Sequence, residues 1–314
     1  MITLPNKAKQ FLVLLLKVLV VVGAFYFIYE RLASNEQLDW VKFQQLVWSK
    51  ASFWSVLLVL FLSFLNRFLE ILKWQNLVQV IKPISVLEAS EQVLGALTLA
   101  LFTPNGIGEY AGKALFFEKI KTKKVIFLNL ICNGIQLILT VIFGVFGLLY
   151  FNTQFHVISS TAVLVLFGLC VLLLGIFFLT KSLKIKGYSI EKLIHKVNEL
   201  PKSVHQKNIL LGVLRYLTFS HQYYFLFLLF DVQIPYLVLI ATITSVYFLA
   251  SSLPTFQFLD FAVKGSVAVY FFGLLGVNEW IVVFISTLMW FLNTVIPVVI
   301  GSYFVLNFKS KWKS

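Results

Sequence analysis

Four basic residues lie inside long apolar runs and are the first candidates for chemistry: Arg67, Lys113, Arg215 and Lys264. Glu109 lies four residues before Lys113, so the two side chains share one face of a helix. Asp260 stands in the same relation to Lys264. A basic side chain at the centre of a bilayer costs about 2.5–3.5 kcal/mol on insertion scales, and it therefore faces a protein interior or a wet cavity. The pattern predicts either a polar site for an anion or a set of internal ion pairs.

Helix-breaking residues accompany these charges in the stretch TPNGIGEYAGKALFF, from Thr103 to Phe117. Thr103 suits an N-cap and Pro104 suits the first helical position, so we expect a half-helix that begins there. Its free N–H groups would suit a phosphate. Gly106 and Gly108 would let a headgroup approach the backbone closely.

The second copy of this pattern follows Pro254, where Ser252 and Thr255 offer similar capping groups. Arg215 precedes Pro254 by 39 residues, as Arg67 precedes Pro104 by 37. Matched positions are offset by 148 residues for the arginines, 150 for the prolines and 151 for the acids and lysines.

Composition places all of these residues in a membrane. The chain has 314 residues, of which 60% are hydrophobic and 12% charged, and its mean hydropathy is +0.91. Apolar runs approach or exceed the roughly 20 residues that a spanning helix needs. Eight spans are predicted, at 11–30, 51–72, 84–102, 125–150, 157–180, 208–230, 235–253 and 280–306. We therefore expect an all-α, polytopic membrane protein.

Basic residues sort by loop, which predicts topology rather than nucleic-acid binding. Four lysines lie in 119–124 and seven in 181–207, which we expect to be a cytoplasmic loop, and both termini would then be cytoplasmic as well. The short segments at 105–118 and 255–274 must return the chain to that side. Two re-entrant, broken hairpins are therefore predicted.

These expectations combine into an inverted-topology repeat, with residues 1–156 as its first unit and 157–314 as its second. Transporters often use such repeats, with discontinuous helices that build a substrate site near the midplane. The competing hypothesis is that each embedded acid and base is only an internal ion pair. Under that hypothesis Arg67 pairs with Glu70, or with Glu88 and Glu91. Glu70 and Lys73 are otherwise expected to reach the membrane interface from the end of their span.

The pattern resembles a known family. TPNGIGEYAGKALF, the stretch NRFLEILKW from Asn66 to Trp74 and the segment from Pro254 to Gly265 resemble the transmembrane region of lysylphosphatidylglycerol synthases, which also occurs alone as a flippase-like family. The resemblance does not extend to a soluble synthase domain. It implies movement of a lipid between leaflets of a bacterial cytoplasmic membrane. The second segment departs from the first, because no glycine directly follows Pro254.

The sequence hypothesis is therefore a flippase-like lipid transporter whose partners are membrane lipids with an anionic or aminoacylated headgroup. Alternatives are an intramembrane lipid-modifying transferase that uses Glu109 or Asp260 as acid or base, and a non-catalytic assembly subunit. Common enzyme signatures such as H-E-x-x-H and G-x-S-x-G are missing, so we expect no catalysis, cofactor or metal. Homo-oligomerisation stays open. The expected substrate site comprises Arg67, Pro104, Gly106, Gly108, Glu109, Lys113, Arg215, Pro254, Asp260 and Lys264.

Overall fold

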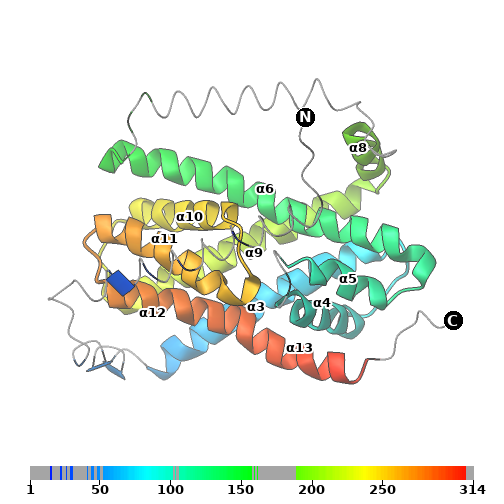
Figure 1. Cartoon of the computed structure of the whole chain (residues 1–314), viewed down its shortest axis with the longest axis horizontal. Helices are drawn as coiled ribbons and strands as arrows, with labels where there is room; N and C mark the ends of the chain where they lie inside the picture. Colours follow the sequence, from blue (N-terminus) through cyan, green and yellow to red (C-terminus); the bar gives the residue numbers. More distant parts are fainter. Residues whose placement is uncertain are drawn as a thin grey trace.

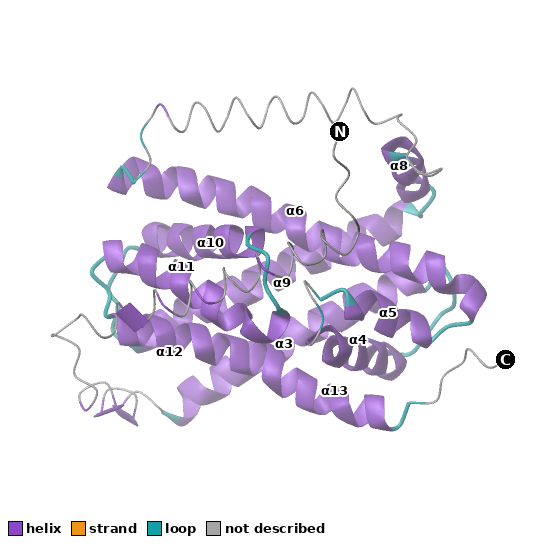
Figure 2. Cartoon of the chain, viewed as in Figure 1, coloured by secondary structure: helices purple, strands orange, loops and turns teal. Residues whose placement is uncertain are grey.

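The structure is a computed structural model that describes residues 52–101, 103, 106–157 and 189–308, with isolated positions between 15 and 49 and at 159 and 161. Within this part of the chain the regular secondary structure is helical, without a strand, as Figure 2 shows. The all-α prediction is confirmed for these residues. Most of the predicted first span, most of the span at 157–180 and Pro104 lie outside the described residues.

Ten α-helices are described in the order of the chain. The first four are α3 (Phe53–Val78), α4 (Val86–Leu101), α5 (Gly108–Leu115) and α6 (Thr122–Phe155). Then follow α8 (Ile190–Asn198), α9 (Lys202–Leu229), α10 (Tyr236–Ser252), α11 (Asp260–Leu274), α12 (Glu279–Trp290) and α13 (Ile296–Leu306). The 3₁₀ turns η1 (Lys119–Lys121) and η2 (Gln257–Leu259) precede α6 and α11, and the π-helix η3 (Phe291–Val295) joins α12 to α13.

Three helical segments have the length and apolar composition to cross a membrane: Phe53–Val78, Lys119–Phe155 and Glu279–Leu306. Helix α10 is a shorter apolar helix. These segments indicate a membrane protein. The predicted span at 208–230 falls in α9, which has 28 residues but is not among these three segments.

The start of α5 differs from the prediction. The helix begins at Gly108 and not at position 104. Thr103 Oγ1 still accepts a hydrogen bond from Gly108 N at 2.7 Å, so the threonine caps the first turn across an intervening turn. Gly106 in that turn has φ +67°, a left-handed conformation that glycine adopts without steric cost. Residues 106 and 107 form a turn, in which Gly106 N donates to the carbonyl of Thr103 at 3.2 Å, before the helix starts.

Helices α3 and α9 pack against each other at the centre of the bundle. On one side α6 packs along α10, and on the other α13 packs along α4; Figure 1 shows α6 and α13 at opposite edges. The contact of α6 with α10 is close, because a Cβ on Gly144 would collide with the Phe248 side chain. The packing places residues from the ranges 66–140 and 215–294 around one central space.

Candidate functional site

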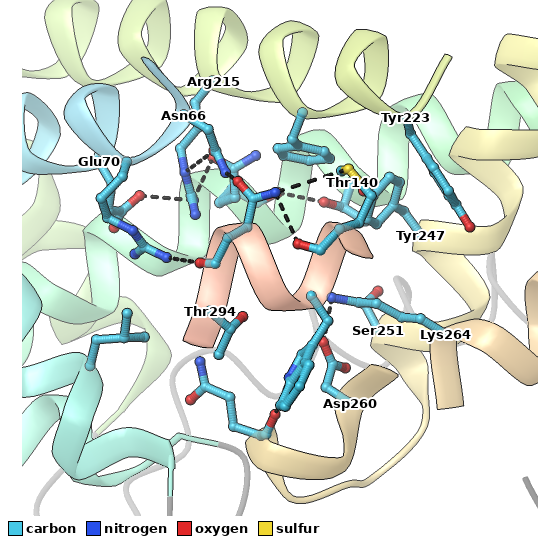
Figure 3. Close-up of a pocket in the computed structure, with 18 of the residues that line it drawn as sticks. Asn66, Glu70, Thr140, Arg215, Tyr223, Tyr247, Ser251, Asp260, Lys264 and Thr294 are labelled. Carbon is cyan, nitrogen blue, oxygen red and sulfur yellow. Dashed lines mark hydrogen bonds and ion pairs between the residues drawn. The ribbon is translucent and has the colours of Figure 1, made fainter. Parts of the chain in front are cut away.

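A cavity of about 310 Å³ lies between these helices. Its wall includes five of the predicted site residues, Arg67, Glu109, Arg215, Asp260 and Lys264. Figure 3 shows Glu70 and Arg215 on one side of this space and Asp260 and Lys264 on the other. Uncharged polar side chains that complete the lining include Asn66, Asn133, Gln136, Gln257, Asn293 and Thr294. The fold thus gathers charges from segments that are far apart in the sequence.

Arg215 forms an ion pair with a residue of the other central helix. Its Nη1 lies 2.8 Å from Oε2 of Glu70, and its Nε donates to Oδ1 of Asn66 at 3.1 Å. Lys73 Nζ lies 3.4 Å from the same Glu70 oxygen and donates to the carbonyl of Cys132 at 3.1 Å. The prediction that Glu70 and Lys73 reach the membrane interface was wrong, because both are buried in this cluster.

Arg67 has a different environment from its counterpart Arg215. Its Nη2 donates to the backbone carbonyl of Asn293 at 2.5 Å. No carboxylate of the described residues lies within 4.0 Å of its nitrogens. The predicted pairing with Glu70 is therefore not formed. Glu88 instead accepts from Ser85 N at 2.8 Å at the start of α4.

Lys113 lies behind the cavity wall and is fully buried. Its Nζ is 2.7 Å from Oε1 of Glu109 and 2.7 Å from Oδ1 of Asn129, and it lies 4.4 Å from the ring centroid of Trp74. These contacts leave Lys113 without exposure to the cavity. Glu109 is the partner that faces the open space, with its side chain 21% exposed.

Lys264 and Asp260 form the equivalent pair on α11, with Nζ and Oδ2 2.5 Å apart. This pair is more open, because the lysine side chain is 35% exposed and the aspartate 23%. Lys264 Nζ also lies 5.7 Å from the ring centroid of Tyr247. Both acid–base pairs that the sequence predicted are therefore formed, and they differ in burial.

The predicted glycines and Pro254 do not line the cavity. A Cβ on Gly108 would collide with the carbonyl of Leu99, so this glycine serves the contact of α5 with α4. A Cβ on Gly106 would lie 3.0 Å from Oε1 of Gln257. Protein atoms therefore occupy the space toward which a Cβ at either glycine would point, and the expectation that these glycines admit a headgroup stays a prediction. Gly106 and Gln257 bring the two predicted hairpin turns together.

The sequence interpretation missed a polar network centred on Asn293 in the π-helix. Asn66 Nδ2 donates to Asn293 Oδ1 at 2.6 Å, and Asn293 Nδ2 donates to Gln222 Oε1 at 3.0 Å. Pro297 lacks an N–H, so the carbonyl of Asn293, four residues earlier, has no α-helical donor and can accept from Arg67. An asparagine four residues before a proline in an apolar run was the available signal.

The cluster in and behind the cavity wall carries an excess of positive charge. Its five basic groups are Arg67, Lys73, Lys113, Arg215 and Lys264, and its three carboxylates are Glu70, Glu109 and Asp260. Two positive charges therefore remain formally unbalanced among the described residues. Such a site favours an anionic group.

A second hollow of about 210 Å³ lies between α3, α9 and α12. Apart from Ser55 its lining is apolar, with Val59, Leu226, Phe284 and Leu292 among the residues. Its chemistry suits hydrocarbon rather than a charged group.

Comparison with family models, with curated proteins and with solved structures finds no match to this chain. The resemblance to the synthase transmembrane region therefore stays a prediction from the sequence.

Proposed function

We propose that this protein is a flippase-like lipid transporter that moves a phospholipid, or another lipid with a charged headgroup, between the leaflets of a membrane. The supporting observation is the central cavity. It brings Arg67, Glu109, Arg215, Asp260 and Lys264 together among helices that include three candidate membrane spans. Ionisable groups at such a depth typically mark a substrate pathway.

The packing of the helices supports an inverted repeat of 1–156 and 157–314. In that scheme α3 corresponds to α9, α4 to α10, and α6 to the α12–α13 segment. The contact of α4 with α13 then corresponds to that of α10 with α6, and both contacts are present. The two central helices, α3 and α9, pack against each other across the proposed axis. Rocking of two such units around a fixed site would provide alternating access.

The two short hairpins fit the same scheme. Helix α5 has 8 residues and would span only about 12 Å at 1.5 Å per residue. It is therefore too short to cross a hydrocarbon core of roughly 30 Å. We propose that α4 with α5, and α10 with α11, enter the bilayer and return. In this scheme α3, α6, α9 and the α12–α13 segment, the longer hairpin arms α4 and α10, and the two predicted spans outside the described residues give about eight spans, with cytoplasmic termini in a bacterial inner membrane.

The lipid itself provides the remaining argument. A lipid needs polar groups for its headgroup and an apolar surface for its chains. The polar cavity offers the first, and the apolar hollow along α3, α9 and α12 offers the second. No described catalytic arrangement is required for this function, and the movement would be downhill or ion-coupled.

A leaflet-translocation assay tests the proposal. The purified chain is reconstituted into vesicles that contain a fluorescent phosphatidylglycerol, and the label in the outer leaflet is quenched chemically. Protein is expected to accelerate access of the quencher to inner-leaflet lipid. If lipid equilibrates no faster with protein than without it, the transport function is rejected. Chromatography of the same lipids would show a new species if the protein were a transferase instead.

A cavity-filling variant provides a matched control. Thr294 lines the cavity, whereas Thr153 lies on the exposed surface of α6. Thr294→Trp is expected to slow translocation strongly, and Thr153→Trp is expected to leave the rate unchanged. Equal rates for the two variants would show that lipid does not pass through this cavity.

A further inference from the structure

We infer that Arg67 is the anion-binding residue of the cavity, and that it binds the phosphoryl group of a lipid headgroup. The identity of the anion as part of a lipid rests on the proposed function. The inference assigns different roles to four basic residues that look equivalent in the sequence. Three of them, Lys113, Arg215 and Lys264, are held by carboxylates of the protein.

The neutralised residues have their partners close by. Arg215 lies 2.8 Å from Glu70, Lys113 lies 2.7 Å from Glu109, and Lys264 lies 2.5 Å from Asp260. An incoming anion would have to compete with each of these carboxylates for its base. Arg67 has no such competitor among the described residues, since its one observed acceptor is the neutral carbonyl of Asn293.

The asymmetry can be traced to a single position in the repeat. The arginines are offset by 148 residues, so the counterpart of Glu70 on α9 is Thr218. Thr218 is neutral, and its hydroxyl donates to the carbonyl of Leu214 in its own helix. The first unit therefore supplies an acid for Arg215, while the second unit supplies none for Arg67.

Unused hydrogen-bond donors point to an acceptor ligand. A guanidinium has five N–H donors, and only one bond from Arg67 is formed within the described residues. Its buried Nε has no acceptor there, and neither has the buried Nε2 of Gln136, another residue of the cavity wall. Buried donors without acceptors are costly, so a ligand rich in acceptor oxygens is favoured. A phosphoryl group has that chemistry and matches the planar guanidinium fork.

The contact with Asn293 positions this guanidinium. Pro297 frees the Asn293 carbonyl, which accepts from Nη2 of Arg67 at 2.5 Å. One donor therefore fixes the side chain, while the partly exposed Arg67 still contributes to the cavity wall. Because the anchor is uncharged, it leaves the positive charge of Arg67 for a ligand.

Binding experiments on the full chain in detergent test the inference. Titration calorimetry uses inorganic phosphate and, separately, dihexanoylphosphatidylglycerol. The wild type is expected to bind at least the lipid. Arg67→Gln is expected to weaken binding by at least about tenfold, as loss of a hydrogen bond to a charged group implies. Lys121→Gln removes the same charge from an exposed site and is expected to bind like the wild type.

The two probes separate the possible sources of the anion. Binding of both probes with similar affinity would support a phosphoryl site that also takes free phosphate. Binding of the lipid alone would support a headgroup site that needs the acyl chains. If the wild type binds neither probe, or if Arg67→Gln binds like the wild type, the inference is overturned.

Thermal unfolding of each variant is measured first, because a variant that does not fold gives no information on binding. If Arg67→Gln does not fold, Arg67→Lys takes its place. Lysine keeps the charge but not the planar fork, so weaker binding than the wild type is expected. Equal binding would again overturn the inference.

The translocation assay separates failure of this inference from failure of the proposed function. If the wild type binds phosphoryl groups through Arg67 but moves no lipid, the anion site stands and the transport function is rejected. If Arg67→Gln moves lipid as fast as the wild type, transport stands and the role of Arg67 is rejected.

Discussion

Glu70 on α3 and Arg215 on α9 form an ion pair of 2.8 Å that links the two central helices. Both side chains are largely removed from solvent, with 6% exposure for the glutamate and 19% for the arginine. Replacing one partner leaves the other charge buried without the opposite charge that stabilised it. Replacing both partners leaves no such unpaired charge. Loss of this contact between the proposed units should therefore cause a measurable fall in stability.

Arg215→Gln is expected to destabilise the protein by about 3–5 kcal/mol, the usual cost of breaking a buried pair. Glu70 would keep the Lys73 ammonium, 3.4 Å away, and the weak thiol donor of Cys132 at 3.5 Å. Thermal unfolding in detergent should show a clear fall in Tm, and the Glu70→Gln/Arg215→Gln double variant should regain part of it. The exposed pair Glu118–Lys121 is the control, because breaking it should cost no more than about 1 kcal/mol. An equal fall in Tm for Arg215→Gln and for Lys121→Gln would contradict a special role for the buried pair.

Lys113→Met tests whether the first acid–base pair is structural. Lys113 is fully buried between Glu109, Asn129 and the Trp74 ring, so its removal should cost about 3–5 kcal/mol and lower the amount of folded protein. Lys264→Met breaks the matched pair, which is 35% exposed at the lysine, and should cost only about 1 kcal/mol. Fluorescence-detected gel filtration compares the amounts of folded protein that the two variants give. A larger loss of folded protein for Lys264→Met than for Lys113→Met would contradict the structural role of the first pair.

The parts of the site that depend on one helix could be predicted from the sequence. Residues four apart on a helix always lie on one face, so the pairs Glu109–Lys113 and Asp260–Lys264 followed from spacing alone. The inward position of the arginines, at the cavity wall, followed from the cost of charge in an apolar segment. These inferences need no knowledge of how the helices pack.

The remaining parts depend on packing between helices, which spacing does not encode. Arg215 pairs with Glu70 because α3 and α9 are neighbours, and the sequence could only offer Glu70 as a partner for the nearby Arg67. Gly108 is close to the Leu99 carbonyl because α5 packs against α4, which the spacing of residues also does not show. The π-helix at Asn293 was signalled by Pro297, but its acceptor role required the position of Arg67.

Gly106→Ala tests the contact between the two hairpin turns. Gly106 has φ +67°, and a Cβ there would lie 3.0 Å from Gln257 Oε1. Gly276 has φ +71° but no atom within 4 Å of such a Cβ, so Gly276→Ala measures backbone strain alone. We expect about 1–2 kcal/mol of strain in both variants. The loss should be larger in Gly106→Ala, because the Gln257 amide must also move. Thermal unfolding measures the stability of both variants. An equal loss of stability would show that this contact between the turns is unimportant.

Asn293→Ala tests the polar network of the π-helix. Asn293 accepts from Asn66 at 2.6 Å and donates to Gln222 at 3.0 Å, and Gln222 is fully buried. Buried groups that lose a partner typically cost about 1–3 kcal/mol each, so a fall in Tm is expected. Asn307→Ala removes an exposed asparagine that donates to Tyr303 O at 2.9 Å, and it should change Tm little. The Arg67 contact uses the backbone carbonyl of Asn293, which alanine retains. Phosphatidylglycerol binding by the folded fraction of Asn293→Ala should therefore exceed that of Arg67→Gln, and weaker binding would indicate that the Asn293 side chain itself contacts the anion.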